Sequence, residues 1–514
     1  MTAHSSSTST RTALERLKLV ERSLKSNMAE SITADYLVIG AGAMAMAFVD
    51  TLLSETTDKK IIMLDRRARP GGHWVTAYPF VRLHQPAAFY GVNSRALDSG
   101  QIDEVGWNKG LFELSSRDAV VAYFDLVMRQ TFLPSGRVEF FPKHEYLGEG
   151  EFKSLLTKKS YKVGPETTIV DATYSRTSVP SMRPPPYEVA KGVDLVTPNG
   201  LPEITRGYAN YTIVGAGKTA IDTCLWLLEN DIKESEITWI MPRDSFFIER
   251  DSLQPASRFP EKAQARIQAT MESTMEATSV EHYLQLQLEK KILYRLDENV
   301  WPTMYHCATV SLLELDAIRK ISNIVRKGRV TKVTPEEVHL EKGTYTPNPD
   351  TLYIDCSASA VAKMSPIPIF HNKTITLQPV RFCQQTFSAA LIAHVEATYP
   401  SSDEAFKNSL CKPVPMPNEP VDNLLVSLQS NINQLRWGQE PEMRKWLAGS
   451  RLDYYGSIFP KPPEDPEQAM EMAKRMREGM VGMSRKLWAL LEGLPEPERT
   501  RVMGQLEGFS LEGL

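Results

Sequence analysis

Two glycine-rich turns of the same form constrain what this chain can fold into more than any other feature. GAGAMA spans residues 40–45, and GAGKTA spans residues 215–220, about 175 residues further on. Each follows an apolar strand, at residues 34–39 and 211–214, and each runs into a stretch with the apolar pattern of a helix. The glycines of such a turn let the backbone approach a pyrophosphate, whose charge the amides at the helix N-terminus stabilise. Two turns of this kind predict two bound dinucleotides.

Length and charge set the broad class of the protein. A chain of 514 residues with 42% hydrophobic and 24% charged residues is long enough for two or three globular domains. The net charge of −4 gives no electrostatic reason to expect a nucleic acid or an anionic membrane as partner. No run approaches the roughly 20 apolar residues of a membrane-spanning helix, and the N-terminus lacks the apolar core of a secretory signal. We therefore expect a soluble, cytoplasmic protein.

The cysteines and histidines indicate neither a redox dithiol nor a metal site. None of the five cysteines forms a CxxC or another close pair, which argues against a redox-active dithiol and against a disulfide scaffold. We expect them to be buried free thiols. No group of histidines and acids has metal-ligand spacing, and GxSxG is absent, so we predict no metal ion and no serine hydrolase. The cysteines are Cys224, Cys307, Cys356, Cys383 and Cys411.

The residues after the first turn fit a nucleotide cofactor with an extended shape. Asp65 ends the second strand, 25 residues after Gly40, where an acid contacts a ribose 2′-hydroxyl. Arg66 is placed to reach the adenosine side of the cofactor. The Gly71-Gly72 pair lets the backbone approach the other end of the cofactor.

The second turn favours NADPH over NADH. Its second strand, at residues 237–241, has no acid at its tip, and Arg243 stands 28 residues beyond Gly215, where a cation pairs with a 2′-phosphate. Asp244 leaves NADH open, because its carboxylate is able to bind a free ribose. Thr219 has a hydroxyl available to the pyrophosphate, and Lys218 either contacts a phosphate or is solvated.

Over about residues 34–360, the chain resembles the flavin-containing monooxygenases and their relatives. The resemblance rests on GAGAMA, LDRRARPGGHW (64–74), DATY (171–174), GAGKTA and DTLYIDCSASA (350–360). It implies FAD at the first turn, NADPH at the second, and residues 71–94 beside the flavin ring. Two departures stand out: Asp355, Cys356 and Ser357 replace the Ala-Thr-Gly of the family, and its Gly-Asp after Thr374 is missing. The candidates around the flavin ring are His73, Trp74, His84, Gln85 and Tyr90.

The resemblance implies an FAD-dependent, NADPH-using monooxygenase, which oxygenates a small organic substrate with molecular oxygen through a flavin (hydro)peroxide. Residues 184–204 stand where a Baeyer-Villiger fingerprint belongs and contain no histidine, so hydroxylation, N- or S-oxygenation and dehydrogenation stay open. A flavin dehydrogenase or oxidase, and a non-catalytic dinucleotide-binding protein, are the alternatives. Because the cofactors do the chemistry, no catalytic side chain is identified.

We predict an α/β fold with two Rossmann-type dinucleotide-binding domains, in which an inserted NAD(P) domain splits the FAD domain. A helical insertion and a helical C-terminal extension complete it, and the extension either covers the active site or forms a contact in a homo-oligomer. The strand at residues 351–355 is expected to rejoin the FAD domain. The predicted segments are a flexible tail (1–33), the FAD domain (34–205 and 346–400), the NAD(P) domain (206–345) and the C-terminal region (401–514). The predicted cofactor-binding residues are Gly40, Gly42, Ala43, Met44, Asp65, Arg66, Gly72, His73, Trp74, His84, Gln85, Gly215, Gly217, Lys218, Thr219 and Arg243.

Overall fold

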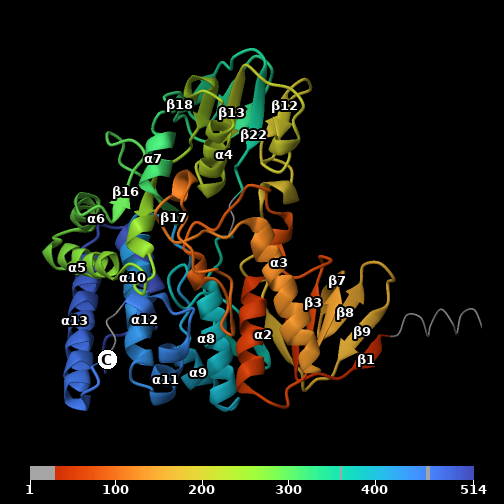
Figure 1. Ribbon diagram of the computed structural model, residues 1–514, viewed down its shortest axis with the longest axis vertical. Helices are drawn as coiled ribbons and strands as arrows, with labels where there is room; N and C mark the ends of the chain where they lie inside the picture. The colour runs from red at the N-terminus through yellow and green to blue at the C-terminus, as the bar shows by residue number, and fades with distance from the viewer. Residues whose placement is uncertain (1–28, 359–361, 459–462, 514) are drawn as a thin grey trace, which may run out of the picture.

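The computed structural model of the chain describes residues 29–358, 362–458 and 463–513. Two parallel sheets, one for each glycine turn, form its frame, and helices pack around them (Figure 1). Most of the tail predicted at residues 1–33 lies outside the described residues. Its end is not a tail: β1 (Glu30–Ile32) pairs in parallel with β9 (Ser160–Val163). The open edge of β9 provides the backbone hydrogen-bond partners of β1, and no local pattern in residues 30–32 predicts this pairing.

The first sheet carries the first glycine turn between its central strand β2 (Tyr36–Ile39) and helix α2 (Ala43–Glu55). Its order is β23-β24-β10-β2-β3-β6, and only the β23–β24 pair is antiparallel. Helix α8 (Gln385–Thr398) packs against α2, and both contribute to the largest hydrophobic core. Ser116 caps α3 (Arg117–Val127), since its hydroxyl accepts a hydrogen bond from the backbone N–H of Ala119. The other strands are β3 (Ile61–Asp65), β6 (Val138–Pro142), β10 (Thr168–Asp171), β23 (Phe370–His371) and β24 (Thr374–Thr376).

The second sheet carries the second turn, between β13 (Asn210–Val214) and α4 (Lys218–Glu229). Its order is β12-β22-β13-β14-β18, and all its neighbouring strands are parallel. The remaining strands are β12 (Asp194–Val196), β14 (Ile237–Ile240), β18 (Ile324–Val325) and β22 (Thr351–Asp355).

Two predicted boundaries of the NAD(P) domain are therefore wrong. The strand at residues 351–355 does not rejoin the first sheet, because β22 pairs with β13 and places Asp355 opposite Val214. Strand β12 also belongs to this unit, although residues 34–205 were predicted to lie in the FAD domain. Buried parallel strands are near-continuous apolar runs, so their sequence does not tell which sheet they complete. The chain returns to the first sheet only at β23 and β24.

Small antiparallel pieces flank both sheets. Strands β7, β8 and β9 pair in antiparallel fashion beside the first sheet. The short strands that have not yet been given bounds are β4 (Gly91–Val92), β5 (Arg95–Ala96), β7 (His144–Gly148), β8 (Glu151–Ser154), β11 (Glu188–Val189), β19 (Val330–Val333), β20 (Val338–Leu340) and β21 (Gly343–Tyr345).

The insertion and the C-terminal region pack together into one body. The predicted helical stretch after residue 260 is two helices, α5 (Pro260–Glu276) and α6 (Val280–Glu289), beside a sheet of order β16-β15-β17. Figure 1 shows α5 and α6 next to α10 and α13, and residues of α6, β17, α10, α13 and α14 share one hydrophobic core. The elements not yet bounded are α7 (Leu312–Ile318), α9 (Glu404–Leu410), α10 (Asp422–Trp437), α11 (Pro441–Gly449), α12 (Tyr454–Ile458), α13 (Pro466–Glu492), α14 (Glu498–Gln505), β15 (Ser245–Glu249), β16 (Leu293–Tyr294) and β17 (Met304–Val310). None of the helices in the described ranges is long and apolar enough to span a membrane.

Candidate functional site

A cavity of about 1720 Å³ lies where the two units, the insertion and the C-terminal helices meet. Both glycine turns open into it, together with the segment that follows Gly72. All the predicted cofactor-binding residues line the cavity except Arg66, so the tertiary structure brings residues from both turns to one place. Within the described ranges, no three His, Cys, Asp or Glu side chains are grouped as a metal site would require.

The first turn is held by Asp65. One carboxylate oxygen, Oδ2, accepts a hydrogen bond from the backbone N–H of Ala41 at 2.8 Å, and Oδ1 accepts one from the backbone N–H of Arg67 at 2.7 Å. This turn after β3 places Arg67 on the cavity wall, whereas Arg66 is exposed and lies off it. The predicted role of Arg66 at the cofactor is therefore not supported, and Arg67 is the arginine beside the site.

The second glycine of the turn faces the double glycine across a very close backbone contact. A Cβ atom on Gly72, which has a φ of +57°, would lie 2.8 Å from the Cα of Gly42. Gly40 is also left-handed, with a φ of +95°, and a Cβ there would lie 3.1 Å from Thr173. The three glycines thus form a surface of bare backbone along the cavity, next to the N-terminus of α2.

The segment after Gly72 forms an aromatic wall. Trp74 donates its indole N–H to the Tyr90 hydroxyl at 2.7 Å, and the two rings meet edge to face. His73 and His84 also line the cavity, and burial lowers the pKa of His73 to about 4 and that of His84 to about 3. Both imidazoles are therefore neutral near pH 7, and neither adds a positive charge to this wall.

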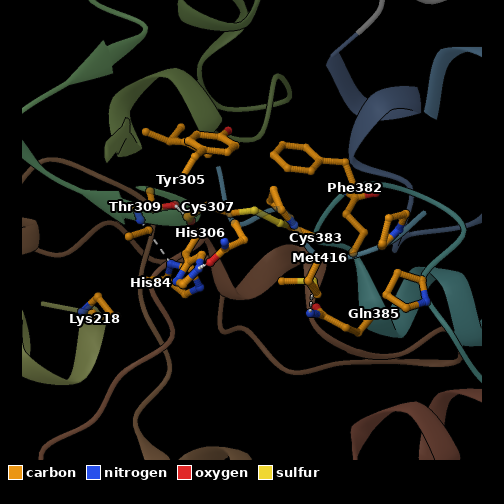
Figure 2. Close-up of a pocket in the computed structure, with 18 of the residues that line it drawn as sticks. His84, Lys218, Tyr305, His306, Cys307, Thr309, Phe382, Cys383, Gln385 and Met416 are labelled. Atoms are coloured by element: carbon orange, nitrogen blue, oxygen red, sulfur yellow. Dashed lines mark hydrogen bonds between the residues drawn. A yellow bond between two sulfur atoms is a disulfide. The ribbon is translucent and has the colours of Figure 1, made fainter. Parts of the chain in front are cut away.

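A buried ion pair fixes the position of His84. Arg250 pairs with Glu314 at 2.7 Å and donates its Nε–H to the carbonyl oxygen of His84 at 3.0 Å. On the imidazole ring, Nδ1 accepts a hydrogen bond from the backbone N–H of Thr309 in β17. Figure 2 shows this hydrogen bond as a dashed line from Thr309 to the His84 ring. Sequence reasoning missed Arg250 and Glu314 because neither lies in a recognisable motif.

The second turn is tied to the first unit through Asp222. Lys218 forms an ion pair with Asp222 one helical turn further on, and Tyr78 donates its hydroxyl proton to the same carboxylate at 2.7 Å. Lys218 is therefore held by a carboxylate rather than fully solvated, and its contact with a phosphate stays a prediction. A Cβ on Gly215 would lie 2.5 Å from the Cys356 carbonyl oxygen, whereas a Cβ on Gly217 would have nothing within 4 Å.

The two candidates for nucleotide specificity both have partners. Asp244 is buried and accepts two hydrogen bonds from the Arg326 guanidinium, at 2.9 and 3.0 Å. This engagement disfavours the alternative in which Asp244 binds a free ribose. Arg243 pairs with Glu419 of the C-terminal region at 2.8 Å, and both side chains are partly exposed.

The end of β22, beside the second turn, differs from the resembled family and carries a buried acidic side chain. Asp355 is fully buried, and its Oδ1 accepts a hydrogen bond from the backbone N–H of Ser357 at 3.1 Å. Its other oxygen and the hydroxyl of Tyr187 have no hydrogen-bond partner among the described residues. Burial, and then the Asp355 charge, raises the pKa of the Tyr187 hydroxyl.

Two cysteines predicted to be free thiols form a disulfide in the cavity wall. Cys307 of β17 is bonded to Cys383, which precedes α8, and both residues line the cavity (Figure 2). The 76 residues between them hid this pairing from the sequence, because only the fold brings the insertion against the first unit. Cys224, Cys356 and Cys411 are buried free thiols, as predicted.

Comparison with known proteins gives the family of the chain and no activity for it. No family model matches it. Proteins of Mycobacterium tuberculosis and Mycobacterium bovis, both named only as uncharacterized, are 48% identical to it over 459 residues, which are 89% of this chain and 83% of theirs. The chain belongs to their family.

Solved structures similar to the chain include those of monooxygenases. The open form of cyclohexanone monooxygenase is 13% identical, with a TM-score of 0.45, and the match covers 74% of this chain and 92% of that one. A polycyclic ketone monooxygenase from Thermothelomyces thermophila is 11% identical, with a TM-score of 0.48, over 91% of this chain and 90% of that one. An NADP+-bound cyclohexanone monooxygenase from Rhodococcus is 13% identical, with a TM-score of 0.44, over 73% and 85%. Similarity at this level assigns no activity to the chain.

Proposed function

We propose that this chain is an FAD-dependent oxidoreductase that takes hydride from NADPH and oxygenates a small organic substrate with molecular oxygen. The observation that carries the proposal is the opening of both glycine turns into the same cavity, with the aromatic segment 72–90 in its wall. In open α/β sheets, ligands bind at the carboxyl ends of the strands, and the cavity joins those ends of both sheets.

The first turn fits FAD. Because Gly40, Gly42 and Gly72 have no side chains, a pyrophosphate can come close to the backbone there. The N-terminus of α2 would stabilise the charge of the pyrophosphate. Asp65 uses one lone pair of each oxygen within the turn, so its carboxylate keeps capacity for ribose hydroxyls. When bound, FAD supplies hydride acceptance and oxygen activation. Trp74 and Tyr90 would exclude water beside it, and the neutral His73 and His84 would offer hydrogen bonds.

The second turn fits NADPH, with Arg243 as the partner of the 2′-phosphate. The open space at Gly217 leaves the N-terminus of α4 accessible to a pyrophosphate. Arg243 would exchange Glu419 for the phosphate. An ion pair between partly exposed side chains contributes at most about 1 kcal/mol, and a phosphate carries more charge than a carboxylate. The exchange is therefore favourable at low cost.

The test is to mix the purified protein with NADPH, first without oxygen and then with it. We expect a yellow protein whose flavin absorbance bleaches with NADPH and returns with oxygen after a transient near-ultraviolet absorbance. Hydrogen peroxide released in amounts equal to the NADPH consumed, with no transient, supports a flavin oxidase instead. A protein purified without flavin, which does not take up added FAD, contradicts the proposal.

A second candidate is a flavoprotein whose second nucleotide site no longer supports turnover. The observation that favours it is Asp355, a fully buried acid next to the second turn where the resembled family has an uncharged residue. A yellow protein that neither NADPH nor NADH bleaches supports this candidate.

A further inference from the structure

The part of the cavity furthest from the two sheets is a chamber built by the insertion and the C-terminal region, which we call the outer chamber. Its walls are α5 residues 266–274, α6 residues 283–287 and α13 residues 475–487. Figure 1 shows these three helices grouped on the side of the molecule away from the first sheet. The cavity-lining residues of α13 are mostly apolar and unbranched, and methionine side chains adapt to ligands of irregular shape. They include Met476, Met480, Met483 and Leu487.

One arginine of this chamber has no ion-pair partner. Arg266 lines the cavity and donates a hydrogen bond to the Ser252 hydroxyl at 2.5 Å, but no carboxylate lies within 4 Å of it in the part of the chain that the structure describes. Two other arginines of the same cavity are paired: Arg243 with Glu419 and Arg501 with Asp422. A partly buried cation without a counter-ion is costly, and an anionic ligand would neutralise it.

The surroundings of Arg266 are aromatic rather than acidic. Burial raises the pKa of the Tyr283 hydroxyl to about 12 and that of Tyr454 to about 12, and the nearby Arg266 charge opposes both rises. Arg266 also acts on the carboxyl group of Glu249, with which it forms no ion pair within 4 Å; burial raises the pKa of Glu249 to about 7. Near pH 7, Glu249 is therefore about half ionised and offsets the charge of Arg266 only in part.

A second polar group of the chamber also has no partner. Gln287 is one helical turn beyond Tyr283 on α6, is 2% exposed, and lines the cavity. Its side-chain amide nitrogen is buried and has no hydrogen-bond partner among the described residues. A buried donor without a partner costs about 1–3 kcal/mol, and a ligand acceptor in the cavity would remove this cost.

We infer that the outer chamber binds the carboxylate of an amphiphilic molecule, with its apolar chain lying along the methionines of α13. The guanidinium of Arg266 would donate charge-assisted hydrogen bonds to the carboxylate, and the amide of Gln287 adds a neutral donor in the lining of the same cavity. A neutral ligand would leave Arg266 without a counter-ion. That such a molecule is the substrate rests on the proposed function, because its far end would then lie toward the glycine turns; the binding itself does not depend on the flavin.

The test uses three ligands with the same chain: decanoate, decanamide and decanol. Isothermal titration of the full-length protein without NADPH should show decanoate binding at least about tenfold more tightly than the other two, as expected for a charge-assisted hydrogen bond. Arg266→Gln should reduce the preference for decanoate over decanamide to about twofold or less. Arg475→Gln is the matched control, because Arg475 lines the same cavity but is exposed and paired with Glu471; we expect it to keep the preference.

Equal binding of the three ligands to the unaltered protein overturns the inference, whether or not Arg266→Gln folds. So does a preference for decanoate that survives Arg266→Gln. Failure of this inference differs from failure of the proposed function. A protein that bleaches with NADPH but binds the three ligands equally contradicts only the carboxylate site. A protein that prefers decanoate but holds no flavin contradicts only the oxidoreductase.

Discussion

The close contact between Gly42 and Gly72 offers a way to distinguish the effect of a substitution on stability from its effect on cofactor binding. The two variants each add one methyl group, to one glycine or to the other. In Gly72→Ala, the new Cβ would lie 2.8 Å from the Cα of Gly42, and the residue would keep a left-handed φ of +57°. In the reciprocal variant Gly42→Ala, the new Cβ would lie 3.6 Å from the Cα of Gly72, which is ordinary van der Waals contact. Gly42 itself has a φ of −79°, which alanine adopts freely.

The two substitutions should differ in their effect on the free energy of unfolding. For Gly72→Ala, the left-handed conformation costs about 1–2 kcal/mol, and the backbone shift that relieves the overlap costs about 1–3 kcal/mol. The expected loss is their sum, about 2–5 kcal/mol. For Gly42→Ala, the change at the N-cap of α2 costs about 1 kcal/mol or less.

The assay is urea unfolding of flavin-stripped protein, followed by tryptophan fluorescence, with flavin retention measured separately on the untreated protein. Stripping is necessary because a bound ligand adds its own stabilisation. We expect Gly72→Ala to lose both stability and flavin. We expect Gly42→Ala to lose flavin alone, because its methyl group occupies the space through which a pyrophosphate approaches. Equal unfolding midpoints for the two variants would refute the steric reasoning, and flavin retained by Gly42→Ala would refute the binding role of the first turn.

Three further predictions test other parts of the site. Arg243→Ala should raise the KM for NADPH about tenfold or more and leave that for NADH nearly unchanged, because it removes a charge-assisted contact that only NADPH has; steady-state kinetics with both nucleotides measure this. Thiol titration in urea should count three thiols before reduction and five after it, because Cys307 and Cys383 are bonded; five thiols at the start would contradict the disulfide. The His84 pKa of about 3 lies below its unfolded value of about 6.5, so folding stability is lost as the pH falls through this window. Urea unfolding at several pH values measures this loss of the free energy of unfolding. In His84→Asn, the loss should be smaller by up to about 1.4 kcal/mol per pH unit. An unchanged pH dependence would contradict the neutral state of the His84 imidazole.

The local elements of the fold were predictable from the sequence, whereas the completion of the sheets was not. The glycine turns and the cap at Ser116 depend on residues within a few positions of one another, so their signals are contained in short windows of sequence. The assignment of residues 351–355 to the first sheet was wrong because a buried apolar strand fits either sheet. The strand at residues 30–32 went unrecognised for a related reason: its partner, the edge of β9, is about 130 residues away.

The same distinction applies to the site. The predicted lining residues come from motifs whose spacing reflects one ligand group, such as Arg243 after the second strand. The groups that hold the site in place, such as Arg250 against His84 and Tyr78 against Asp222, come from segments without a motif. Their partners are more than 140 residues apart in the chain, so no periodicity or spacing links them. Arg66 was predicted and Arg67 was not, because the turn after β3 decides which of the two side chains reaches the cavity.

By itself, the sequence determined that the chain has two strand–turn–helix units with bare glycine backbone, since that geometry depends on residues without a Cβ at particular positions. Only the tertiary structure decided that the two turns open into one cavity and that Cys307 meets Cys383. It also decided that the insertion and the C-terminal helices, nearly 200 residues apart in the chain, together enclose a chamber with an unpaired Arg266. These contacts are long-range because they form only when separate apolar faces are buried against each other, and a face that will be buried does not specify its partner.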